Sequence, residues 1–168
     1  MRAMTRPIVN LADLEFRPFG HGERFEARIG AIGARVGAQK LGYNLTVLPP
    51  GKCAFPLHSH RVNEEMFFVV EGSGEIRIGG ERHPIRAGDV IACPPGGPES
   101  AHQIINTAPS GELKYLAVST RMYPEVAEYP DSGKFGVMAE LPPGPDGKPQ
   151  VLRFLGRFAG SLDYWDGE

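Results

Sequence analysis

A short segment, His58-Ser59-His60-Arg61-Val62-Asn63-Glu64-Glu65, carries residues whose types and spacing suit metal binding. Successive side chains of a β-strand point to opposite faces, so His58 and His60 would share a face. A carboxylate from the next strand, Glu64 or Glu65, and a third histidine from a later strand, His102, would complete a site of three nitrogens and one oxygen. This donor set suits a divalent transition metal and leaves coordination positions free for water or substrate.

The elements that must hold these residues are predicted to be short strands. The chain contains 22 glycines and 16 prolines, which interrupt it too often for long helices. Gly79-Gly80 predicts a tight hairpin turn, because glycine tolerates positive φ. Many short strands at near-regular spacing indicate an all-β sandwich or barrel. We predict strands at 25–29, 41–48, 66–70, 75–78, 90–93, 103–105 and 113–119.

At 168 residues the chain is long enough for one domain with a substantial core. Within that domain we expect an N-terminal arm over residues 1–40, a barrel over 41–120 and a C-terminal extension over 121–168. The extension is too apolar for a free linker. We expect its aromatic residues to pack on the barrel or across a dimer interface, in preference to forming a catalytic lid.

Two sequence motifs resemble those of the cupin superfamily. The first cupin motif is a glycine, H-x-H, three or four residues, a glutamate, six residues and a glycine, matched here by Gly51, His58, His60, Glu65 and Gly72. The second is a glycine, five residues, P-x-G, a short spacer, a histidine, three residues and an asparagine, matched by Gly88, Pro94-Pro95-Gly96, His102 and Asn106. The gap before His58 is one residue longer than usual, and the spacer before His102 also exceeds the common length.

The resemblance implies a double-stranded β-helix, or jelly roll, with a metal held by His58, His60, Glu65 and His102. Glu65 is preferred to Glu64 because six residues separate it from Gly72, as the motif requires. The implied cofactor is one divalent transition metal, which could be zinc, iron, manganese or nickel. The resemblance does not identify the reaction, because this scaffold carries isomerases, dioxygenases, decarboxylases, epimerases, sensors and storage proteins.

Two classes of function are expected from such a site. The first is a metalloenzyme of the isomerase type, in which the metal acts as a Lewis acid on a sugar, sugar phosphate or hydroxy acid. Glu64 or a metal-bound water would transfer the proton. With iron, the same site would suit a dioxygenase. The second class is a non-catalytic module that binds a small molecule inside the barrel.

Composition excludes other partners and suggests a compartment. The net charge is −2, from 18 basic and 20 acidic residues without a basic stripe, so nucleic acid is not an expected partner. No apolar run reaches membrane-spanning length, and the N-terminus lacks the apolar core of an export signal. We therefore expect a cytoplasmic protein in which Cys53 and Cys93 are reduced thiols. We also expect a homodimer, because jelly-roll barrels leave sheet edges that a second copy can cover.

Overall fold

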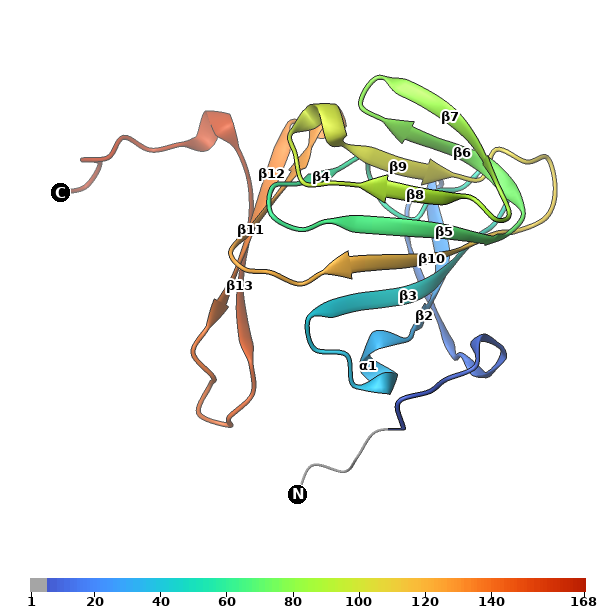
Figure 1. The fold of residues 1–168 in the computed structure, drawn as a ribbon. Helices are drawn as coiled ribbons and strands as arrows, with labels where there is room; N and C mark the ends of the chain where they lie inside the picture. Colours follow the sequence, from blue (N-terminus) through green and yellow to red (C-terminus); the bar gives the residue numbers. More distant parts are fainter. Residues whose placement is uncertain (1–5) are drawn as a thin grey trace.

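The computed structural model describes residues 6–168, and these residues fold mainly into β-strands (Figure 1). The strands are β1 Phe16–His21, β2 Phe25–Ala31, β3 Leu41–Leu48, β4 Ser59–His60, β5 Glu65–Glu71, β6 Ser73–Ile78, β7 Glu81–Arg86, β8 Val90–Cys93, β9 His102–Ile105, β10 Leu113–Thr120, β11 Glu125–Tyr129, β12 Lys134–Leu141 and β13 Gln150–Arg157. The helices are short: α1 Gly33–Val36 and the 3-10 turns Leu11–Asp13, Pro98–Ser100, Pro130–Ser132 and Phe158–Gly160.

Three antiparallel sheets make up the fold. A six-stranded sheet has the order β1-β2-β3-β10-β5-β8, and a three-stranded sheet has the order β7-β6-β9. These two sheets form the barrel, and the third sheet, β13-β12-β11-β4, lies against one end of it (Figure 1). The all-β jelly roll expected from the sequence is confirmed.

Strand β5 shows how the apolar sequence is divided between two layers. Phe67 and Val69 are buried, 6% and 0% exposed, and belong to the main core between the sheets. The alternate residue Phe68 is 38% exposed on the other face. Val70, also on that face, packs against a smaller cluster that includes Leu14 and Ile32 from the N-terminal segment. Both faces of β5 are apolar because the N-terminal segment covers part of the outer face.

Several strand predictions are confirmed, and others were missed. Strands β3 and β8 have the predicted bounds, and the observed β2, β5, β6, β9 and β10 are longer than predicted by one to two residues. Within the segment expected to form an N-terminal arm, residues 1–40, strands β1 and β2 join the six-stranded sheet, and β2 pairs directly with β3. Strands β1, β4, β11, β12 and β13 were not among the predicted strands.

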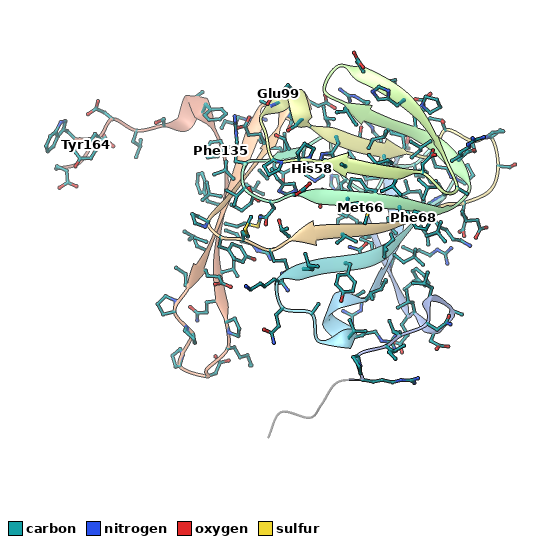
Figure 2. All side chains as sticks on the ribbon, viewed as in Figure 1. His58, Met66, Phe68, Glu99, Phe135 and Tyr164 are labelled. Carbon is teal, nitrogen blue, oxygen red and sulfur yellow. The ribbon has the colours of Figure 1, made fainter. Side chains whose placement is uncertain are left out.

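The C-terminal extension forms a sheet and then leaves the barrel. Strand β11 pairs with β4, so the extension contacts the segment that carries the first histidines. Beyond β13 the chain runs away from the barrel, and Figure 2 shows Tyr164 far from it. Tyr164 is 84% exposed and Trp165 is 72% exposed. These two aromatics therefore do not pack on their own barrel, and of the two expected arrangements the dimer interface stays a prediction.

The structure also bears on the cysteines and on membrane-spanning helices. Cys53 and Cys93 are both buried and free, as predicted for reduced thiols. Among residues 6–168, no helix is long and apolar enough to span a membrane.

Candidate metal centre

The three predicted histidines are brought together by backbone pairing. His60 lies on β4, and the residue before it, Ser59, is buried on the opposite face of the strand. His58 forms a β-bridge with His102 at the start of β9, in which each backbone amide donates to the other residue's carbonyl, at 3.2 and 2.8 Å. Strand alternation and one bridge are therefore enough to place all three imidazoles on one wall of the barrel.

The carboxylate of Glu65 lies at the centre of these imidazoles. Its Oε2 atom is 2.8 Å from His102 Nε2 and 3.7 Å from the Nε2 atoms of both His58 and His60. The side chains of His58, His60 and Glu65 are each 16% exposed, and that of His102 is 4% exposed. The structure thus brings together the four residues selected from the sequence. His58, His60 and Glu65 each offer a ligand atom within 4.8 Å of the others, and His102 joins the group through its contact with Glu65.

The outer nitrogens of the imidazoles face acceptors, which orients the inner nitrogens. His58 Nδ1 lies 2.9 Å from the Pro56 carbonyl oxygen, and His102 Nδ1 lies 3.2 Å from that of Ser100. An Nδ1–H donated to a carbonyl leaves the Nε2 lone pair free for a metal, which is how metal-ligating histidines are usually held. The cluster therefore fits a divalent transition metal on the chemistry of its donors.

Glu125 is a functional candidate that the sequence analysis missed. It is 1% exposed on β11, and its Oε2 atom lies 3.5 Å from His60 Nδ1, a buried nitrogen without a hydrogen-bond partner among the described residues. The backbone amides of Arg61, Val62 and Asn63 donate to Glu125 at 2.8 to 3.2 Å. The carboxylate thus fixes the turn between β4 and β5 and faces the outer nitrogen of His60.

No ligand spacing in the sequence marks Glu125. The only signal is the alternation of Glu125, Ala127 and Tyr129 along one face of β11, which places a carboxylate in line with a small apolar side chain. The pairing of Ala127 with His60 brings that face against the histidines.

Burial and neighbouring charges shift the pKa values of the ligands. Burial, followed by the charge of His102, lowers the pKa of His58 to about 4, so its imidazole is neutral and available as a ligand at neutral pH. Burial opposes the charged form of His102, but contacts with the Cys93 thiol and Glu65 raise its pKa to about 10. Burial likewise opposes charge on Glu65, but the hydrogen bond from His102 holds its pKa below the usual value. His102 must therefore lose a proton to ligate a metal.

Glu64, the predicted proton-transfer residue, is not brought to this cluster. Its side chain is exposed, and its recorded contacts are backbone hydrogen bonds with Thr120. His83 does not join the cluster either. Its side chain is 50% exposed on the β6–β7 hairpin and lies near Glu81. The structure thus separates the two adjacent glutamates and places Glu65, the one preferred from the motif spacing, among the histidines.

A cavity of about 240 Å³ opens beside the four predicted ligands inside the barrel. Its apolar wall is formed by Phe55, Phe67, Ile104 and Ala117, and its polar wall by Asn44, Gln103 and Tyr115. The Gln103 amide donates to the Phe55 carbonyl at 2.7 Å and accepts from Arg24 at 3.1 Å, which fixes its orientation. The Asn44 amide oxygen accepts a hydrogen bond from Thr46 at 2.8 Å, and no bond from the Asn44 nitrogen is recorded among the described residues.

Comparison with known protein families supports the barrel fold and shows which part of the chain forms it. Residues 44–119 match the family model of the cupin domain. Residues 44–119 form a cupin domain. In this chain the cupin domain contains all four of the clustered residues, whereas Glu125 lies outside the matched segment.

Three similar proteins are informative. A sugar phosphate isomerase of the cupin superfamily from Silicibacter pomeroyi superposes with a TM-score of 0.73 at 26% identity, covering 95% of this chain and 98% of that one. Quercetin 2,3-dioxygenase of Bacillus subtilis is 33% identical over 84 residues, which is 48% of this chain and 25% of that protein. The oxalate-binding protein of Thermotoga maritima is 37% identical over 71 residues, 42% of this chain and 54% of that protein. The chain therefore matches only part of the length of these two curated relatives.

Proposed function

We propose that this cupin domain is a metal-dependent enzyme that isomerises a small oxygen-rich metabolite, such as a sugar, a sugar phosphate or a hydroxy acid. The observation that carries the proposal is the convergence of three imidazoles and one carboxylate at the wall of a cavity inside the barrel. The similarity to a protein named as a sugar phosphate isomerase, over nearly the whole of both chains, supports the same class.

His58, His60, Glu65 and His102 would hold the metal, which when bound supplies a Lewis acid able to polarise a substrate carbonyl. The remaining wall suits a short polar molecule. The Asn44 amide nitrogen can donate to a substrate oxygen, while Phe67 and Ile104 exclude water from its carbon atoms. Burial raises the pKa of the Tyr115 hydroxyl, which therefore stays neutral and can donate a hydrogen bond.

A dioxygenase is the second candidate, favoured by the apolar wall and by the identity with quercetin 2,3-dioxygenase. The cavity, at about 240 Å³, is smaller than the roughly 300–1,000 Å³ of pockets that enclose drug-sized ligands. This size favours a metabolite of a few carbons over a flavonol. Oxygen uptake by iron-loaded protein, measured across small oxygen-rich compounds, separates the two candidates: uptake supports a dioxygenase, and product without uptake supports an isomerase.

Metal analysis tests the proposal directly. Protein purified without a chelating column should contain about one first-row divalent metal per chain. His102→Ala should lose most of it and should also lose the rise in melting temperature that the metal gives, since a ligand bound only to the native state stabilises it. His83→Ala, which changes an exposed histidine, is the matched control and should retain the metal. Equal metal content in His102→Ala and the parent would contradict the assignment.

A further inference from the structure

A second cavity, of about 140 Å³, lies beside the first, and the two share His60 and Glu65 as wall residues. The proposed metal site therefore borders two spaces. On the side of the second cavity, the wall is completed by the end of β10 and the residues that follow it, including Ser119, Arg121 and Tyr123. Ser119 pairs with Glu65 across β10 and β5, so the two side chains are neighbours on one face of the sheet.

Part of this wall is fixed by its own hydrogen bonds. The Asn63 side chain accepts from the Thr120 hydroxyl at 3.0 Å and from the Met122 amide at 2.7 Å. It also donates to the Met122 carbonyl at 3.0 Å and to Glu125. These groups are therefore engaged with one another and hold the β10–β11 connection in place.

Arg121 is the charged group of this wall that has no such engagement. It is exposed, and no ion pair or hydrogen bond of its guanidinium is recorded within residues 6–168. Its backbone amide donates to the Lys40 carbonyl at 2.9 Å, and its side-chain carbons lie beside Gly42. The backbone position is thus fixed, while the guanidinium is free to meet a ligand.

We propose that the second cavity is an anion subsite in which Arg121 binds a phosphate or carboxylate group of the substrate. This inference rests on the proposed function, because it places the anionic group of the substrate next to the metal site. A guanidinium is suited to paired hydrogen bonds with such oxygens. Two carboxylates, Glu65 and Glu125, also line this cavity. A divalent metal would offset their two charges and leave the Arg121 guanidinium as the net positive charge of the wall, so anion binding should be stronger in the metal-loaded protein.

The test uses Mn²⁺-loaded protein with inorganic phosphate or acetate as the probe. Paramagnetic relaxation of the ³¹P nucleus or of the acetate methyl protons reports binding near the metal, and titration gives the affinity. At least one anion should bind saturably, and Arg121→Gln should weaken that binding roughly tenfold, as expected for a lost charge-assisted hydrogen bond. The anion with the greater dependence on Arg121 identifies phosphate or carboxylate as the favoured group.

The control is Arg86→Gln, because Arg86 is an exposed arginine that lines a different cavity on β7. It should bind both anions as the parent does, and Mn²⁺ affinity should be unchanged in both variants. Absence of saturable anion binding to the loaded parent, or unchanged binding in Arg121→Gln, would overturn the subsite. If the parent binds no Mn²⁺, the proposed function fails instead, and the effect of Arg121→Gln on phosphate binding to metal-free protein then decides the subsite alone.

Discussion

Glu125 is the residue whose environment most extends the site beyond the four proposed ligands. A buried carboxylate that faces the outer nitrogen of a ligating histidine orients the imidazole and increases its basicity. We therefore expect Glu125→Gln to weaken metal binding by about 10- to 100-fold, the usual effect of losing such a partner. Metal affinity is measured by competition with a chelator of known affinity.

The control at this scale is Glu128→Gln, on the same strand. Glu128 contacts Arg61 and no histidine, so its substitution should leave metal affinity unchanged. A purely structural role for Glu125 would lower the melting temperature of the metal-free protein without changing the metal affinity. That outcome would contradict the orienting role.

At the scale of elements, the motif glycines are explained by the turns that connect the strands. Gly72, between β5 and β6, has φ +85°, and a Cβ there would collide with the carbonyl oxygen of Glu112. Gly88, between β7 and β8, has φ +95° but open space around it. Alanine at either position would have to adopt a strained backbone conformation, which lowers the free energy of unfolding by about 1–2 kcal/mol.

Only Gly72→Ala adds a steric conflict, which should cost about 1–3 kcal/mol more. The free energy of unfolding in urea should therefore fall further for Gly72→Ala than for Gly88→Ala. Equal losses in the two variants would show that the contact with Glu112 relaxes freely. The comparison separates the cost of backbone strain, which both variants share, from the cost of the steric contact with Glu112, which only Gly72→Ala has.

At the scale of the whole molecule, a group of exposed apolar side chains lies on the outer face of the β11–β13 sheet. We call the side chains of Phe135, Leu152, Phe154 and Phe158 the tail face. Phe135 stacks on Phe158 with ring centroids 4.7 Å apart and lies beside the sheet (Figure 2). Leu152, Phe154 and Phe158 are 48%, 56% and 66% exposed. An apolar surface of this kind is typical of an interface.

We expect the chain to form a homodimer in which a second copy covers the tail face. Light scattering at micromolar concentration should give twice the chain mass of 18.3 kDa. Phe154→Ser should shift the mass toward the monomer, because it places a hydroxyl at the centre of the tail face. Val90→Ser is the control, since Val90 is 68% exposed on β8, away from this sheet. A parent mass of one chain would contradict the expectation.

The sequence by itself determined most of the barrel strands and the four clustered residues. Strand alternation puts His58 and His60 on one face, and motif spacing selects Glu65 and His102, so local geometry and order along the chain were sufficient. Tertiary structure alone decided the rest. Glu125 faces His60, and Arg121 lines the neighbouring cavity, only because β11 pairs with β4 and β10 ends beside Glu65. Such pairings join residues some sixty positions apart, and no local pattern of side chains encodes which strands will meet.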